Sequence, residues 1–212
     1  LPEISPIKGS DPIWEYRNKM EYTFSNRRWL TPEQMASGEE FNDRDGAGFH
    51  IPGAFDKVLD IDRCHLQGEL GNRLRNFVRD YGIDRGLSFY DLRAQQGLLR
   101  TLMVRMASTG ESMAVMSFGE DNPQAVREVM DAIRGEFPDI TSLMYVINLK
   151  VNDTITDQEV LLHSGRPYIE EEMEGLRFRI GPKSFYQTNS RQAYELYKVV
   201  RDFAGLTGDE LV

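Results

Sequence analysis

The sequence predicts an α+β fold in which a largely antiparallel sheet packs against a few helices. Segments with a two-residue apolar period follow one another directly in the chain, and segments with a helical period separate only some of them. Strands joined by short turns pair antiparallel, whereas a parallel sheet needs a crossover after each strand. With 212 residues and 40% hydrophobic content, the chain is long enough for one large domain or one and a half smaller ones.

The first expected element is a β-hairpin over residues 14–29. Polar and apolar side chains alternate along it, so one set would face the core and the other the solvent. Asn26-Arg27 would form the turn, and Trp29 would return to the core. The apolar face comprises Tyr16, Met20, Tyr22 and Phe24, and the polar face comprises Arg17, Lys19, Glu21, Thr23 and Ser25.

The remaining elements follow from the same two periods and from turn chemistry. Residues 31–46 are polar and rich in turn formers, which predicts an exposed loop. Pro52-Gly53 and Thr109-Gly110 each join a pair of strands, and Asn122-Pro123 is a typical helix start. In order, we expect strands at 49–51 and 57–60, a helix at 66–81, strands at 98–106 and 112–118, a helix at 123–137, and strands at 143–150, 159–163, 168–173 and 176–180.

A last helix is expected from Asn189 or Ser190 to Gly205. Its apolar residues recur at helical spacing, and we expect that stripe to be buried. The stripe comprises Ala193, Leu196, Tyr197, Val200 and Phe203. The sequence has no initiator Met and closes on a turn followed by Leu211-Val212, which resembles the start of a buried strand, so we expect a longer parent protein.

Charge and composition restrict the function. A net charge of −9 argues against a surface built wholly for nucleic acid, although a local basic face could still bind RNA. No apolar run reaches the roughly 18 residues of a membrane span. The single cysteine, Cys64, excludes an internal disulfide and fits a reducing, cytoplasmic compartment. The three histidines have no metal-ligand spacing, and no dinucleotide or P-loop glycine motif is present.

Arg17 and Lys19 form the first local feature of interest. In a strand they would lie on one face, about 6.6 Å apart, close to the phosphate repeat of a nucleic-acid strand. Both could then contact one RNA backbone. Alternatively they are two solubilising charges on an ordinary sheet face, which the residues alone favour.

The second feature is the segment 181–189, which joins a strand to a helix. Phe185, Tyr186 and Gln187 precede free helical N–H groups, and such a corner can stack a flat ring and hydrogen-bond its edge. The alternative is a capping motif, in which Asn189 caps the helix with Gln192 three residues on and the aromatic side chains are core.

Two further features have simple alternatives. Cys64 lies at a strand-to-helix junction and is either a small buried thiol or a cluster ligand whose partners this chain lacks. The acidic run Glu170-Glu171-Glu172 is expected to be an exposed strand edge, where charge discourages edge pairing.

Several segments in fixed order resemble the RNA (uracil-C5)-methyltransferase family, which modifies ribosomal or transfer RNA. The stretch from Gly48-Phe49-His50 to Cys64 is more similar to the branch that acts on 23S rRNA than to the tRNA branch. The matching segments are Tyr16-Arg17-Asn18-Lys19-Met20, Gly48-Phe49-His50 with Asp60-Ile61-Asp62-Arg63-Cys64, Leu99-Arg100-Thr101-Leu102-Met103-Val104-Arg105, and Phe185-Tyr186-Gln187-Thr188-Asn189.

The resemblance implies two domains. Residues 1–180 would form a central α+β RNA-recognition domain, and 181–212 the linker and first helix of a truncated Rossmann-like domain that binds S-adenosylmethionine. The implied partner is RNA, ribosomal rather than transfer RNA, and neither DNA nor a membrane. The family's catalytic cysteine and general base would lie beyond Val212, so no residue of this chain is expected to be catalytic.

The resemblance also implies site residues. Gln187 would contact S-adenosylmethionine, and Phe185 would lie beside a flipped-out uracil. Cys64 would be the last of four ligands to a 4Fe–4S cluster found in some members, with the others upstream of Leu1, so no cluster is expected in this chain itself. In the implied reaction a cysteine thiolate attacks uracil C6, and C5 takes the methyl group from S-adenosylmethionine. A base then removes the C5 proton and the thiolate leaves C6.

Two other classes of function stay open at this point. One is a protein-interaction or structural domain with no RNA role, which the net acidity favours. The other is a complete small enzyme of unknown type, which the lack of a catalytic constellation disfavours.

Overall fold

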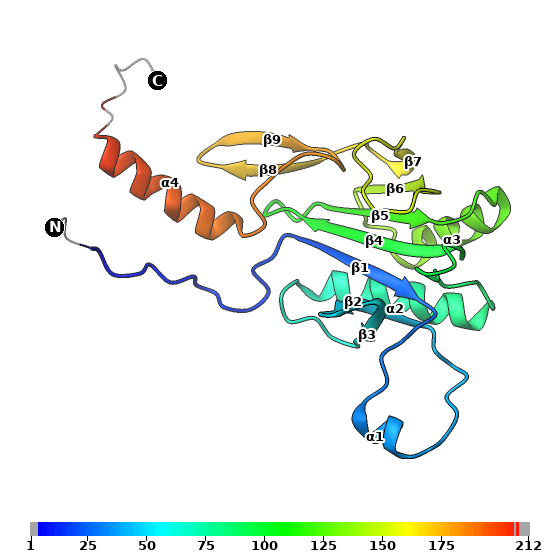
Figure 1. The fold of residues 1–212 in the computed structure, drawn as a ribbon. Helices are drawn as coiled ribbons and strands as arrows, with labels where there is room; N and C mark the ends of the chain where they lie inside the picture. Colours follow the sequence, from blue (N-terminus) through cyan, green and yellow to red (C-terminus); the bar gives the residue numbers. More distant parts are fainter. Residues whose placement is uncertain (1–3, 206, 208–212) are drawn as a thin grey trace.

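A seven-stranded sheet forms the centre of the protein in the computed structural model, which describes residues 4–205 and 207 (Figure 1). Its strands are β1 (Lys19–Ser25), β2 (Gly46–Ile51), β3 (Ala54–Asp60), β4 (Leu99–Met106), β5 (Ser112–Phe118), β6 (Ser142–Ile147) and β7 (Leu161–Gly165). They lie in the order β3-β2-β1-β4-β5-β6-β7. All neighbours pair antiparallel except β5 and β6, which are parallel. The predicted α+β class with a largely antiparallel sheet is confirmed.

Two helices, α2 (Glu69–Asp84) and α3 (Pro123–Glu136), cover one face of the sheet. The alternation predicted for β1 holds from Lys19 to Phe24, because Met20, Tyr22 and Phe24 are all buried in the core on this face. Ser25, which was expected on the solvent face, is buried as well. Helix α3 forms the crossover between the parallel strands β5 and β6. It starts where the sequence predicted, with the Asn122 side chain accepting a hydrogen bond of 3.2 Å from the Ala125 amide.

A hairpin of β8 (Ile169–Met173) and β9 (Leu176–Ile180) lies over the opposite face of the sheet (Figure 1). The hairpin contributes Ile169 and Ile180 to a second, smaller core, whose other buried members are Met103, Met113, Val115 and Met144 of the sheet. Strands β4, β5 and β6 therefore bury one set of side chains under the helices and the other set under the hairpin and its connecting loops.

The prediction of a hairpin at residues 14–29 is wrong. Strand β1 pairs with β2 and β4, which are distant in sequence, and no turn forms at Asn26-Arg27. Both of these side chains instead hydrogen-bond the carboxylate of Asp91, at 3.3 and 3.1 Å. The chain then enters the predicted loop, which contains a short helix, α1 (Pro32–Ala36), that was not predicted from the sequence.

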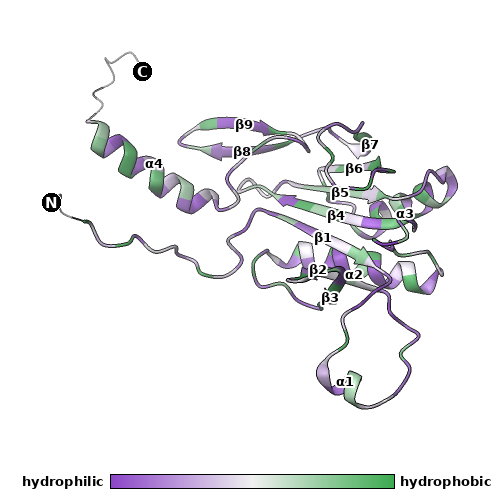
Figure 2. Cartoon of the chain, in the orientation of Figure 1, coloured by the Kyte–Doolittle hydropathy of each residue, from purple (hydrophilic) through white to green (hydrophobic). Residues whose placement is uncertain are grey.

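Helix α4 (Ser190–Ala204) starts where predicted, and it ends at Gly205, whose φ of 59° is the left-handed geometry that glycine adopts most easily. The expected burial of its apolar stripe is wrong for most of the stripe. Only Ala193 of this helix is buried, while four apolar residues of the stripe are exposed because α4 projects away from the sheet (Figure 1, Figure 2). These are Leu196, Tyr197, Val200 and Phe203.

The prediction that the acidic run Glu170-Glu171-Glu172 in β8 is exposed is wrong for its middle residue. The Glu171 side chain is only 1% exposed, and its carboxylate accepts hydrogen bonds from the main chain and the hydroxyl of Ser108. Strand alternation turns this middle residue inward between its two neighbours. Across the part of the chain that the structure describes, no helix is long and apolar enough to cross a membrane. The turn and strand expected at 208–212 lie outside that part.

Candidate nucleic-acid interface

The segment between β9 and α4 is held against the sheet by hydrogen bonds to its main-chain carbonyls. The side-chain amide of Asn18 donates to the carbonyl of Gln187 at 2.9 Å, and the main-chain N–H of Asn18 donates to that of Thr188 at 2.8 Å. Farther back, the Arg105 guanidinium donates to the carbonyl of Ser184 at 2.6 Å. These contacts fix the path of the backbone, so the side chains along it point in defined directions.

The two aromatic residues of this segment point to opposite sides. Tyr186 is partly buried in the second core and contacts the ring of Phe178, with 6.2 Å between ring centroids. Burial, followed by the charge of Glu171, raises the pKa of Tyr186 to about 12. Phe185 is 86% exposed, and the side chain of Gln187 is exposed as well. The aromatic residues are therefore not both core, and Phe185 and Gln187 are free to contact a ligand.

Asn189 caps α4, as one of the two sequence alternatives proposed. Its side-chain oxygen accepts a hydrogen bond of 3.1 Å from the Gln192 amide, and its Nδ2 donates to the Ser10 hydroxyl at 3.0 Å. The Gln192 side chain does not close a reciprocal capping box, because it donates to the carbonyl of Lys8 at 3.0 Å. The corner thus combines a helix cap with an exposed aromatic ring and an exposed amide.

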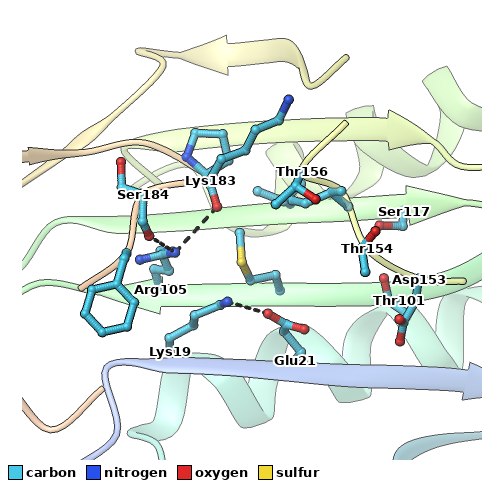
Figure 3. Close-up of a pocket in the computed structure, with 15 residues that line it drawn as sticks. Lys19, Glu21, Thr101, Arg105, Ser117, Asp153, Thr154, Thr156, Lys183 and Ser184 are labelled. Atoms are coloured by element: carbon cyan, nitrogen blue, oxygen red, sulfur yellow. Dashed lines mark hydrogen bonds and ion pairs between the residues drawn. The ribbon is translucent and has the colours of Figure 1, made fainter. Parts of the chain in front are cut away.

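A cavity of about 340 Å³ lies beside this segment, on the sheet face that carries the second core (Figure 3). Strands β1, β4 and β5 form its floor, and residues 153–156 and 182–185 form its walls. Figure 3 shows the basic side chains Lys19 and Arg105 toward one end, and Thr101, Ser117, Asp153 and Thr154 toward the other. Lys183 also lines the cavity but donates its ammonium group to the Gln158 carbonyl.

Arg105 is the unusual side chain of this cavity. It is only 5% exposed, and its guanidinium has no carboxylate within ion-pair distance among the residues described. Its Nε is buried without a hydrogen-bond partner in the described chain. Burial lowers the pKa of Arg105, an effect that the charge of Glu21 opposes, yet arginine stays protonated in proteins. The cavity therefore contains a permanent cation that forms no ion pair with any described carboxylate.

Arg105 was not among the site residues that the sequence predicted. The available signal was an arginine within β4, a strand whose other residues are mostly buried and apolar. A charged side chain at such a position costs free energy unless it has a partner, and so marks a candidate binding site.

The structure separates the two predicted RNA-binding cations. Lys19 lines the cavity of Figure 3 and forms an ion pair with Glu21. Arg17 lines a different, more open hollow of about 530 Å³, together with Arg191 at the start of α4. The reason is that β1 begins only at Lys19, so the two-residue alternation assumed for both residues does not reach Arg17. The Arg17 main chain instead donates to the carbonyl of Leu66 at 2.8 Å.

Cys64 is a buried member of the main core. The Asn72 side chain bonds both its main-chain amide and its carbonyl, at 2.7 and 3.1 Å. Within residues 4–205 and 207, no group of three or more His, Cys, Asp or Glu side chains is arranged to hold a metal ion. The described residues therefore give Cys64 no companion ligands, and its side chain packs as a thiol of the core.

Gln187 has a suitable side chain for a cofactor contact but little enclosure. Its amide makes no hydrogen bond to any described residue, so both its donor and acceptor are available. It does not line the cavity of Figure 3. An exposed amide with no bonded partner among the described residues can donate to and accept from a ligand, but Gln187 alone encloses no site.

Comparisons with known proteins show what the whole chain is similar to. No family model matches the chain. It is 58% identical to a Porphyromonas gingivalis protein named an uncharacterized RNA methyltransferase, and 54% identical to a Bacteroides thetaiotaomicron protein of the same name. Both alignments cover 100% of this chain, which spans 47%, about half, of the length of each relative.

The fold is also similar to a solved structure, that of Pyrococcus abyssi tRNA (uracil-54, C5)-methyltransferase in complex with S-adenosyl-L-homocysteine. The TM-score is 0.66 at 23% sequence identity, and the match covers 91% of this chain and 42% of that one. At this level of identity the likeness establishes a shared fold.

Proposed function

We propose, on the premise that this chain belongs to the RNA (uracil-C5)-methyltransferase family, that it is the RNA-recognising part of a longer enzyme that methylates C5 of a uridine. The observation that carries the proposal is the relationship of the entire chain, at 58% and 54% identity, to two proteins named RNA methyltransferases. Transfer RNA is named for the Pyrococcus protein. We favour 23S rRNA for this one because of the stretch from Gly48-Phe49-His50 to Cys64.

We further propose that residues 1–180 form the RNA-recognition domain and 181–212 lead into the domain that binds S-adenosylmethionine. The exposed apolar stripe of α4 supports this division, because an amphipathic helix is stabilised mainly by packing its apolar side against another element. The end of β9 at Ile180 agrees with the proposed boundary.

Four side chains have proposed roles. Arg17 and Lys19 bind RNA phosphates from two separate hollows, and Phe185 offers its exposed ring to the target uracil. Gln187 hydrogen-bonds the methyl donor with its free amide. S-adenosylmethionine, when bound, supplies the methyl group. Cys64 is too buried to act as a nucleophile, so we assign no catalytic residue to this chain.

The proposal is tested by giving the longer parent protein labelled S-adenosylmethionine with 23S rRNA or tRNA transcripts. Digestion of the RNA to nucleosides and mass spectrometry should identify 5-methyluridine, formed from the ribosomal transcript. Methylated nucleosides of another kind would contradict the uracil-C5 assignment. Formation of 5-methyluridine in tRNA alone would contradict only the choice of ribosomal RNA.

A further inference from the structure

We infer that the cavity between β1, β4 and residues 182–185 binds one nucleotide of single-stranded RNA, with its phosphate against Arg105 and Lys19. The inference rests on the proposed RNA function and adds to it a specific site, next to the position proposed for the target uracil. It replaces the predicted joint action of Arg17 and Lys19 on one backbone with a pair of cations that the structure brings to one cavity.

The lack of an ion-pair partner for the buried Arg105 points to an anion as the ligand. Burying a guanidinium without a carboxylate is costly, and Arg105 is held only by the carbonyls of Pro182 and Ser184. A phosphate would supply both the missing charge and acceptors that suit the planar guanidinium. Binding of a phosphate would therefore relieve a cost that the unliganded protein carries.

Lys19 provides the second positive charge. It is paired with Glu21, but the Glu21 side chain is 59% exposed, and a solvent-exposed ion pair of this kind contributes little. A phosphate can therefore take the place of the Glu21 carboxylate at Lys19 while Glu21 turns to water. The remaining carboxylate of the cavity, Asp153, lies toward the other end in Figure 3 and would repel a second phosphate there.

The size and the far end of the cavity favour one nucleotide. About 340 Å³ is near the lower limit of small-ligand pockets, roughly 300 Å³, and too small for a duplex. The hydroxyl groups of Thr101 and Ser117 offer donors and acceptors to a ribose or a base edge. Contacts to the ribose 2′-hydroxyl are a means by which proteins distinguish RNA from DNA.

Phe185 places this nucleotide relative to the target. Its exposed ring lines the same cavity, and aromatic side chains of this kind stack bases of single strands. If the target uracil lies at Phe185, the nucleotide in the cavity is a neighbour of the target uridine. The cavity then fixes the position of the strand and leaves the target base free.

The test measures binding of a short, labelled, single-stranded, uridine-containing RNA to the full chain by fluorescence anisotropy at several salt concentrations. Arg105→Gln and Lys19→Gln each remove one proposed phosphate contact. Thr154→Trp fills the cavity from an exposed loop without changing any charge. The control is Arg127→Gln, which removes one exposed positive charge on α3, on the other side of the sheet.

We expect Arg105→Gln and Lys19→Gln each to weaken RNA binding on the order of tenfold and to lower the salt slope by about one. Thr154→Trp should weaken binding, while each phosphate contact that remains should contribute the same amount to the salt slope as in the wild type. Arg127→Gln should bind RNA like the wild type. Thermal melts identify any variant that fails to fold. If Arg105→Gln fails to fold, RNA binding by Lys19→Gln and Thr154→Trp decides whether the cavity is the site.

Three results would overturn the inference. If folded Lys19→Gln and Thr154→Trp bind RNA as the wild type does, the cavity is not the site, although the proposed RNA function stands. If the wild-type chain binds no RNA, the proposed function of this part of the protein fails as well. If uridine monophosphate binds the wild type more tightly than the RNA does, the cavity takes free nucleotides instead of a strand.

Discussion

The side-chain amide of Asn18 donates a hydrogen bond to the main-chain carbonyl of Gln187, with 2.9 Å between Nδ2 and O. This bond joins the residue just before β1 to the segment just before α4, although the two residues are 169 positions apart in the sequence. The position of the exposed Gln187 side chain thus depends on Asn18, the residue that precedes β1.

Asn18→Ala is expected to loosen the segment at residues 181–189. The variant loses one of the two hydrogen bonds from this residue, so the free energy of unfolding should fall by about 1 kcal/mol. Hydrogen exchange measured by mass spectrometry should be faster in the peptide that contains residues 181–189. Asn42→Ala, in the exposed loop, is the matched control, and equal exchange in both variants would contradict the anchoring role.

Gln187→Ala and Asn189→Ala should differ in kind. Gln187 is exposed and its amide bonds nothing within the described chain, so its loss should leave stability unchanged while costing about 1–3 kcal/mol in methyl transfer by the parent enzyme. Asn189 caps α4, so its loss should cost about 1 kcal/mol of stability. Denaturant melts and transfer rates measured side by side check this. A Gln187→Ala protein that is less stable but fully active would remove Gln187 from the proposed cofactor site.

Local sequence patterns predicted most of the elements. Strands β4 and β5 could be predicted because a short turn at Thr109-Gly110 joins two apolar segments, and Asn122 marked the start of α3. The partners of β1 could not, because they come from distant segments, and the apparent turn at Asn26-Arg27 serves instead to bind Asp91.

The candidate site was harder to predict because it depends on tertiary packing. Sequence identified the corner around Phe185 and Gln187, but it left open which aromatic residue points outward. It gave no reason to pair Lys19 with Arg105, because these residues are 86 positions apart in the sequence. In the structure they are direct partners in the register of the adjacent strands β1 and β4. The burial of Glu171 and the exposure of Leu196 likewise depend on which elements lie nearby.

Arg17→Ala should weaken RNA binding for all sequences and lower the salt slope by about one, as expected for a phosphate contact. Because Arg17 and Lys19 line different hollows, their effects on the binding free energy should add in the double variant. Salt titrations of the four proteins measure this. An unchanged slope in Arg17→Ala would mean that this residue is an ordinary surface charge.

Tyr186→Phe should change how stability depends on alkaline pH. Burial raises the pKa of the Tyr186 hydroxyl from 10.0 to about 12, so its contribution to stability is complete below pH 10 and is lost as the pH rises through 12. The hydroxyl has no hydrogen-bond partner in the described chain, so Tyr186→Phe should be at least as stable at neutral pH. Between pH 10 and 12 the variant should lose less stability than the wild type, as measured by urea unfolding. Parallel curves for the two proteins would contradict the burial of this group.

The central claim, that this chain is part of an enzyme that methylates uridine at C5, is tested most directly by tritium release. Replacing the C5 hydrogen with a methyl group must release that hydrogen, so RNA carrying [5-³H]uridine reports on this position alone. We predict that the longer parent protein releases tritium only with S-adenosylmethionine, and that this chain of 212 residues releases none by itself. Incorporation of methyl groups into the RNA without release of tritium would contradict the account.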